Sequence, residues 1–98
     1  MTAVVVNHLH FSVPVDQIAE PVRREAPAVF DSCPGFRAFY FVKTADDRAT
    51  AVIVWDSPEH AQQGAAKIGP GLFAQYLAPY LASDQQRSVG QAIIEHSR

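Results

Sequence analysis

The chain contains a single cysteine, Cys33, among its 98 residues, so no disulfide bond can form within it. One cysteine is typical of proteins from a reducing compartment, and we expect Cys33 to be a small buried hydrophobic residue rather than a nucleophile. The sequence also lacks an apolar run of about 18 residues, the length that a transmembrane helix needs. We therefore expect a cytoplasmic protein that has no membrane partner.

Basic residues are also few. Eight Lys and Arg stand against ten Asp and Glu, and the formal net charge is −2 with neutral histidines. Nucleic-acid binding depends on a basic patch, so we expect no nucleic-acid partner. The sequence contains no Ser/His/Asp order, no pair of carboxylates and no glycine-rich phosphate or dinucleotide loop, which argues against several common enzyme classes.

The segment from Pro34 to Ser57 gives the clearest structural signal. Its two runs rich in Phe, Tyr, Val, Ile and Trp, Gly35–Thr44 and Ala49–Asp56, are typical of strands. The short polar segment between them predicts a hairpin turn. Ser57 followed by Pro58 predicts the start of a helix.

The residues before the hairpin predict one strand and one helix. Ala3–Val13 has the β-branched and alternating pattern of a strand. Asp16–Ser32 has helical spacing of apolar residues, with Asp16 as the expected cap. Because Pro21 and Pro27 each remove a backbone hydrogen bond, we expect this helix to start late or to be kinked into two pieces.

The residues after the hairpin predict a second helical region and a last strand. Pro58–Ile68 is expected to be a short helix that Gly69 to Gly71 break. Leu72–Leu81 resumes a helical stripe, which Pro79 should bend or end. Val89–Glu95 is predicted to be the last strand.

This order of elements over residues 1–98 predicts one domain with an α+β, ferredoxin-like sandwich. We expect an antiparallel four-stranded sheet, with the first and third strands in the centre and both helices on one face. Yet the third strand has Ala51, Ile53 and Trp55 on one face and Val52 and Val54 on the other. A large bare apolar face is unusual on a monomer, so we expect a homodimer through this face of the sheet.

The residues PGFRAFYFVKTADDRATAVIVWDSPEHA resemble the central segment of the antibiotic biosynthesis monooxygenase-like family. In that family Pro-Gly-Phe opens the second strand and Trp-Asp/Glu-Ser closes the third. An Asn in the first strand and a Gly-Pro in the second helical region extend the resemblance over nearly the whole chain. The resemblance implies a dimeric α/β barrel with a pocket between the helices and the sheet of each subunit.

Members of this family include cofactor-independent oxygenases of polycyclic aromatic phenols and heme-degrading monooxygenases. Asn7 matches the strand asparagine of the heme degraders. Their helix tryptophan would fall between Gly64 and Ala66, where this chain has none, and Gln75 occupies the position of their histidine ligand. An amide is a poor axial ligand for heme iron, so the sequence disfavours heme degradation.

Asn7 is the first candidate functional residue because its strand face is otherwise apolar. Its amide could orient a ligand oxygen or polarise O2, or it could make a structural hydrogen bond to a helix or loop. The hypothesis assigns catalysis to Asn7, which would stabilise developing negative charge, and to Tyr76, which would manage protons. The residues expected to bind the substrate are Phe11, Phe39, Phe73 and Gln75.

His8 and His10 share the opposite face of the first strand, about 7 Å apart. They could bind a metal with further ligands, but a position at the dimer interface or its edge is favoured, where they would make association sensitive to pH. We expect no metal site. His60 is expected to be exposed in the first turn of its helix.

The leading hypothesis is a cofactor-independent monooxygenase that oxidises a small phenolic or quinone-type aromatic with O2, without metal or flavin. The alternative is a non-catalytic ligand-binding or stress-associated dimeric barrel that uses the same cavity.

Overall fold

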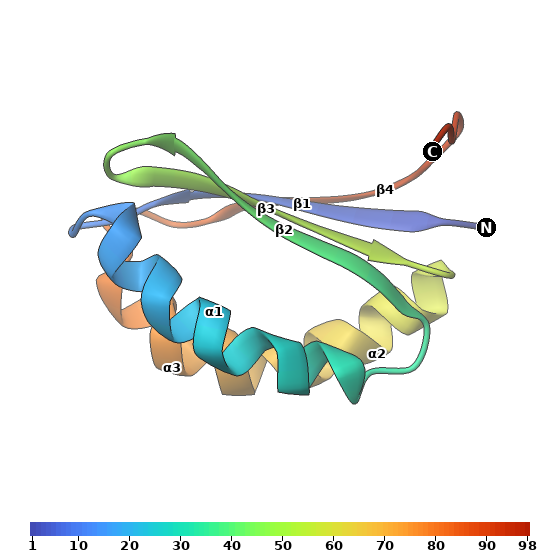
Figure 1. The fold of residues 1–98 in the computed structure, drawn as a ribbon, viewed down its shortest axis with the longest axis horizontal. Coiled ribbons are helices and arrows are strands. Elements are labelled where there is room, and N and C mark those ends of the chain that lie inside the picture. Colours follow the sequence, from blue (N-terminus) through green and yellow to red (C-terminus); the bar gives the residue numbers. More distant parts are fainter.

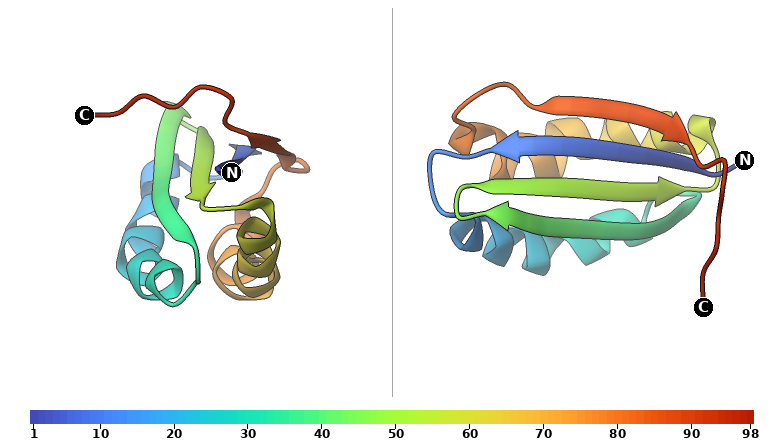
Figure 2. Two further views of the ribbon diagram at one scale, coloured as in Figure 1. Left: turned by 90° about the vertical axis from the view of Figure 1, so that its right-hand side faces the viewer. Right: turned by 90° about the horizontal axis from the view of Figure 1, so that it is seen from above.

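Helices cover one face of a four-stranded antiparallel sheet and leave the other face bare (Figure 1). The computed structural model describes residues 1–98. The strands are β1 (Ala3–His10), β2 (Phe36–Ala45), β3 (Arg48–Trp55) and β4 (Gln86–Gln91). Their order in the sheet, β2-β3-β1-β4, puts β1 and β3 in the centre (Figure 2). The predicted α+β, ferredoxin-like sandwich is confirmed.

The alternation of side chains along β1 separates two faces. Val5 and Leu9 are buried toward the helices, whereas Val4 and Val6 are only half-buried on the outer face. Asn7 lies between Val5 and Leu9 on the inner face, directly opposite Ala51 of β3. The strand is shorter than expected, because after His10 the chain leaves the ladder.

The N-terminal end of the first helix is held by the β2–β3 turn. The Val15 N–H donates to the carbonyl of Asp46 at 2.7 Å, and the Phe11 N–H donates to the carbonyl of Asp47 at 2.8 Å. The helix N-cap is Pro14, with no side-chain hydrogen bond, so the expectation that Asp16 caps the helix is wrong. The carbonyl of Asp46 thus accepts a hydrogen bond from the first turn of the helix, which the side chain of Asp16 was expected to do.

Helix α1 (Val15–Asp31) is continuous through both of its prolines, so the expected late start or break does not occur. Neither Pro21 nor Pro27 lies on the fully buried face. The carbonyls that lose their helical partners belong to Gln17 and Arg23, which are exposed, and water can bond to them. Burial of the opposite face against the sheet holds the helix together.

Helix α2 (Pro58–Ile68) has the predicted bounds, and the Ser57 hydroxyl caps it by accepting from the His60 N–H at 3.2 Å. The expectation that His60 is exposed is wrong. Its ring is half-buried, hydrogen-bonded to the Ser57 hydroxyl, and lies against Gly35. Gly35 has a φ of 77°, so both its backbone conformation and the nearby imidazole require a residue without a side chain.

The glycine-proline segment after α2 does not break the helical region. Gly69–Phe73 forms a π-helical turn that runs directly into the short helix α3 (Ala74–Tyr76), and a 3₁₀ turn, Ala78–Tyr80, follows. A π-helical hydrogen bond spans one residue more than an α-helical one. The helical backbone therefore continues through the two glycines and the proline. Helix α3 already ends at Tyr76, and Pro79 lies in the 3₁₀ turn beyond it, so the helix is shorter than the predicted Leu72–Leu81.

Strand β4 begins three residues earlier than expected and ends at Gln91. Its register is set by pairing with β1, in which Gln86 lies opposite His8 and Gln91 opposite Ala3. The apolar Ile93 and Ile94, which suggested a strand, are 87% and 85% exposed beyond its end.

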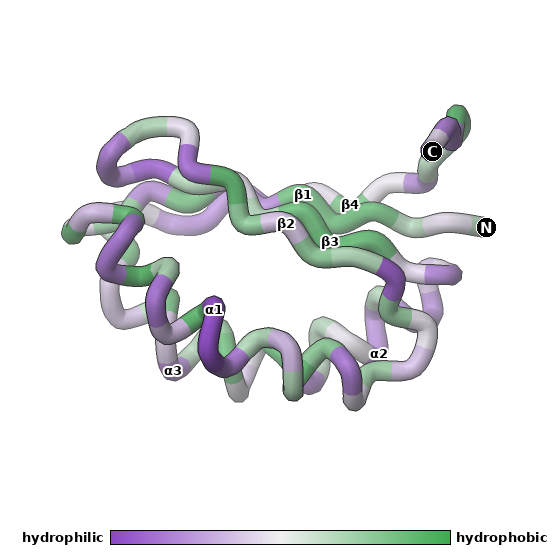
Figure 3. The backbone as a smooth tube through the Cα atoms, viewed as in Figure 1, coloured by the Kyte–Doolittle hydropathy of each residue, from purple (hydrophilic) through white to green (hydrophobic).

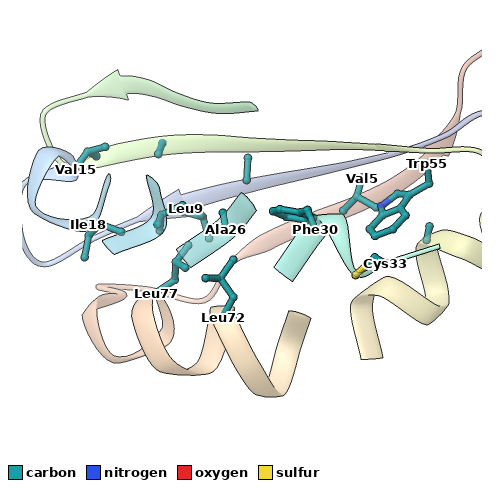
Figure 4. Close-up of a cluster of buried hydrophobic side chains, with 14 of the residues drawn as sticks. Val5, Leu9, Val15, Ile18, Ala26, Phe30, Cys33, Trp55, Leu72 and Leu77 are labelled. Atoms are coloured by element: carbon teal, nitrogen blue, oxygen red, sulfur yellow. The ribbon is translucent and has the colours of Figure 1, made fainter. Parts of the chain in front are cut away.

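The core is a cluster of buried hydrophobic side chains between the sheet and the helices (Figure 4), and hydrophobic and hydrophilic residues alternate along the helices (Figure 3). Cys33 is buried in it, as predicted. Trp55 is the largest fully buried side chain, and its six-membered ring rests on Gly64 of α2, where an added methyl group would overlap it. None of the helices combines the length and hydrophobicity that a membrane crossing requires.

The contact between Gly64 and Trp55 predicts a large effect of a small substitution. Gly64→Ala should lower the free energy of unfolding by about 1–3 kcal/mol, because the methyl group forces the indole to move in a packed core. Gly71→Ala is the matched control, since nothing lies near the position of its added methyl group. Denaturant unfolding should find the control unchanged or slightly more stable. Equal stability of the two variants would contradict the packing described here.

Candidate functional site

A cavity of about 130 Å³ lies between the sheet and the helices. Its walls come from the inner faces of β1, β2 and β3, from α1 and α2, and from the π-helical turn. Fifteen of the nineteen residues that line it are hydrophobic. Such a chamber suits an apolar or aromatic molecule whose orientation is fixed by a few polar groups.

The polar side chains of the lining gather beside β4. They belong to Asn7, Gln85 and Arg87, and the register of the sheet places Arg87 directly opposite Asn7. None of the ion pairs in the structure involves Arg87. Its guanidinium group is therefore free to meet a negatively charged group at this end of the cavity.

Two polar atoms in the lining are buried without a hydrogen-bond partner. The Asn7 side-chain nitrogen donates to the Gln85 side-chain oxygen, but Asn7 Oδ1 accepts from nothing. The indole nitrogen of Trp55 also lacks a partner. A buried polar group without a partner lowers the free energy of unfolding by about 1–3 kcal/mol. Neither group therefore stabilises the fold, and a ligand that bonds to it would explain its presence.

The structure brings three of the expected site residues together: Asn7, Phe39 and Phe73 all line the cavity. Phe11 does not. Its ring is 1% exposed within the core, with its centroid 6.4 Å from that of Phe41. Phe11 follows the last residue of β1 and lies beyond the cavity.

Gln75 and Tyr76 also lie outside the lining. Gln75 is exposed to solvent, while Tyr76 packs half-buried toward α1, beside Arg24. Glu25, hydrogen-bonded to Arg24, raises the pKa of that guanidinium, and the Tyr76 hydroxyl adds to the effect. The π-helical turn decides this placement, because it turns Leu72, Phe73 and Leu77 toward the cavity instead.

The two strand histidines lie on the outer face of the sheet, as predicted. His8 Nδ1 is 3.1 Å from the Thr50 hydroxyl, and His10 Nε2 is 3.0 Å from an Asp47 carboxylate oxygen. No group of three or more His, Cys, Asp or Glu side chains is placed to hold a metal ion. The favoured position at a dimer interface stays a prediction.

Sequence reasoning missed Gln85, Arg87 and Trp55 as site residues. Gln85 and Arg87 both precede Val89, where the last strand is predicted to begin, so the sequence does not relate either of them to Asn7. The signal that could have revealed Arg87 is its spacing of two from Val89, because residues two apart on a strand share a face and these two lie opposite Asn7 and Val5. Trp55 was read only as the residue that closes β3.

No family model and no curated protein matches the sequence of this chain. Solved structures do match its fold. SnoaB, a cofactor-independent oxygenase from Streptomyces nogalater, is 18% identical, with a TM-score of 0.77 over 96% of this chain and 95% of its own. The monooxygenase of the ActVA-Orf6 gene of Streptomyces coelicolor, solved with the ligand nanaomycin D, is 17% identical, with a TM-score of 0.73 over 97% and 92%.

A variant of MhuD, with two manganese protoporphyrin IX molecules bound per active site, is also similar in fold. It is 17% identical, with a TM-score of 0.73 over 98% of this chain and 99% of its own. The chain thus has the fold of the antibiotic biosynthesis monooxygenase-like proteins, as the sequence resemblance implied. At these identities the likeness concerns the fold.

The residues of the cavity do not fit a heme. Its lining contains no His, Cys or Tyr side chain, and these are the residues that supply strong axial donors to heme iron. Gln75, at the position of the histidine ligand, is outside the lining.

The unpartnered amide oxygen of Asn7 predicts a gain in stability when the amide is removed. Asn7→Leu should raise the free energy of unfolding by about 1–2 kcal/mol, because an apolar side chain replaces a buried unsatisfied group. Gln85 is exposed, so water can replace its bond to Asn7. Gln91→Leu, which removes an exposed amide, should change stability by less than about 0.5 kcal/mol. A loss of stability in Asn7→Leu by denaturant unfolding would mean that Asn7 Oδ1 is satisfied in solution.

Proposed function

We propose that the chain is a cofactor-independent monooxygenase that oxidises a small phenolic or quinone-type aromatic compound inside this cavity. The observation that carries the proposal is the buried, unpartnered Oδ1 of Asn7 in an otherwise apolar chamber, with Arg87 opposite it. SnoaB, a cofactor-independent oxygenase, and the ActVA-Orf6 monooxygenase share the fold and support the same class of reaction.

Asn7 orients the substrate in this proposal. Its free Oδ1 accepts a hydrogen bond from a ring hydroxyl that stays protonated and is not the one that ionises, while its nitrogen donates to Gln85, so the amide has one fixed orientation. Phe39 and Phe73 hold the ring system by apolar contact. A fixed orientation matters because small displacements of reacting groups lower rates steeply.

Arg87 favours the ionised substrate. A positive charge nearby lowers the pKa of an acidic group, so the guanidinium group increases the fraction of substrate anion at a given pH. The anion then supplies the electrons to O2. One oxygen atom enters a ring carbon as a carbonyl, and the other leaves as water with the hydrogen of that carbon and the proton that the ring hydroxyl lost on ionisation. The proposal assigns no role to Tyr76, Gln75 or Phe11, because they do not line the cavity.

A non-catalytic ligand-binding protein is the alternative, and one observation favours it. The only charged side chain in the lining is Arg87, which stays protonated at all ordinary pH values, so the cavity offers no group that could accept the substrate's proton. The substrate must therefore lose its proton to water. A ligand without an acidic hydrogen would be bound and not oxidised.

Oxygen uptake with anthrone-type phenols tests this proposal. Asn7→Ala should lower kcat/KM roughly a hundredfold by misplacing the ring. Arg87→Gln should lower it roughly tenfold or more, because a hydrogen bond to a charged group is lost.

Arg48→Gln is the matched control for this assay, since Arg48 lies at the hairpin end of β3 and does not line the cavity. It should leave oxygen uptake unchanged. Tight binding of the same phenols without uptake would support the binding protein instead. Neither binding nor uptake across the panel would exclude both.

We also propose that the protein is a homodimer through the outer face of the sheet. The middle of this face is apolar and incompletely covered, and Tyr40 and Val42 are 58% and 46% exposed. On the two central strands, Val6 lies directly opposite Val52 on the same face. No helix covers this face of the sheet (Figure 2). Such a patch is typical of an interface. The single buried cysteine further supports a cytoplasmic location.

Tyr40→Asp tests the dimer, because it places a charge on this face without removing core packing. The wild type should sediment at twice its chain mass of 10.7 kDa. The variant should dissociate at least about tenfold more readily, since an unpaired charge in a dry interface costs several kcal/mol. Ala28→Asp, on the exposed side of α1, is the control and should stay dimeric. A monomeric wild type at micromolar concentration would refute the dimer.

A further inference from the structure

A second hollow adjoins the cavity on the side of the edge strand β2. It is an open groove of about 470 Å³ between α1 and β2, where α1 lies beneath the strand (Figure 2). Four residues line both this groove and the cavity of about 130 Å³: Val22, Phe30, Phe39 and Phe41. Their side chains therefore form the wall between the cavity and the groove.

Three of the four wall residues form a row of aromatic rings. The Phe39 ring lies between the other two, with centroid distances of 4.6 Å to Phe30 and 6.4 Å to Phe41. Both pairs are stacked, with interplanar angles of 29° and 28°. Stacked rings attract one another beyond the effect of their buried area, so the row holds Phe39 in place in the free protein.

A β-bulge aims Phe39 into this wall. Phe36 and Ala38 pair with consecutive residues of β3, so Arg37 between them is an extra residue in the ladder. The extra residue reverses the alternation of side chains. Phe39 therefore faces inward together with Phe36, although the two are three positions apart. Without the bulge, the alternation would turn Tyr40 inward and Phe39 outward.

Phe39 is also the ring whose displacement opens the wall at its centre. Val22 and Phe30 are 3% and 2% exposed, so both are fixed in the core. Phe39 and Phe41 are half-buried and belong to a strand with no neighbour on its outer edge. Of these two, Phe39 has a wall ring on each side, and turning it into the groove joins the groove to the cavity.

The cavity behind this wall has room for one aromatic ring. A closed apolar cavity of about 150 Å³ holds a benzene molecule. This cavity is slightly smaller, at about 130 Å³. The second ring of a fused pair must therefore pass through the wall into the groove. The groove suits it, because seven of its ten lining residues are hydrophobic.

We infer that Phe39 determines the size of the ligand, and that the preferred ligand is a phenol with a single aromatic ring. A ligand with further fused rings binds only when Phe39 turns into the groove and gives up its stacking contacts. The three rings of an anthrone-type phenol enter in this way. The inference rests on the proposed function for its site and adds a specificity-determining residue.

Nuclear magnetic resonance titration of the full chain, without oxygen, tests this inference. The two probes are resorcinol and naphthoresorcinol, which carry the same pair of hydroxyl groups on one ring and on a fused two-ring frame. The backbone cross-peak of Leu72 reports on the cavity and that of Ala19 on the groove, because each residue lines only one of them. Resorcinol should shift Leu72 alone in the native chain, and naphthoresorcinol should shift both.

The variant Phe39→Ala removes the centre of the wall. It should improve the affinity for naphthoresorcinol, relative to that for resorcinol, roughly tenfold, because the larger probe no longer displaces a stacked ring.

Phe36→Ala is the matched control. Phe36 also stacks on Phe30, with centroids 4.8 Å apart, but it lines the groove and not the cavity. Its replacement leaves the wall intact and should change the ratio of affinities less than about twofold. If either alanine variant does not fold, Phe39→Leu and Phe36→Leu replace the pair, and the first should change the ratio roughly threefold.

The outcomes separate this inference from the proposed function. If both probes shift Leu72 but the ratio of affinities is the same in Phe39→Ala and the native chain, the role of Phe39 is refuted and the cavity remains the ligand site. A shift of Ala19 by resorcinol in the native chain also refutes it. If the ratio changes as expected but no phenol is oxidised, the inference holds and the monooxygenase proposal fails. If neither probe shifts any cavity residue, both fail.

Discussion

The pleat of β1 is the constraint on which the rest of the molecule depends. Because side chains alternate along a strand, burying Val5 and Leu9 under the helices forces Asn7 into the same interior. The same alternation sends Val4 and Val6 to the outer face, where no helix covers them. The alternation of side chains thus places an amide inside an apolar cavity and apolar side chains on the outer face of the sheet.

The interior is packed tightly at one end and left open in the middle. At the closed end, the contact between Trp55 and Gly64 is so close that β3 and α2 cannot approach further. In the middle, the π-helical turn from Gly69 to Phe73 follows α2 and lines the cavity without filling it. π turns are frequent at functional sites. Two buried polar atoms without partners cost stability, and proteins accept such a cost mainly where a ligand binds.

The structural features that could be predicted from the sequence are those that neighbouring residues set and tertiary contacts reinforce. The hairpin, the Ser57 cap and the bounds of α2 are confirmed because turn residues and caps act within a few positions. The continuity of α1 could not be predicted, since proline costs are local but the burial that overcomes them comes from the sheet. The start of β4 was missed for a related reason: its residues are all exposed, so only pairing with β1 defines it.

The sequence by itself determined the α+β architecture and the presence of an amide among apolar residues in the first strand, because periodicity and turn chemistry are properties of neighbouring residues. Only the tertiary structure decided which side chains meet that amide. Arg87 reaches Asn7 through strand register, and Trp55 reaches the same cavity through its fit against a helix. Tyr76 is excluded by the turn that precedes it. Such contacts join residues far apart in the chain, and no local pattern records them.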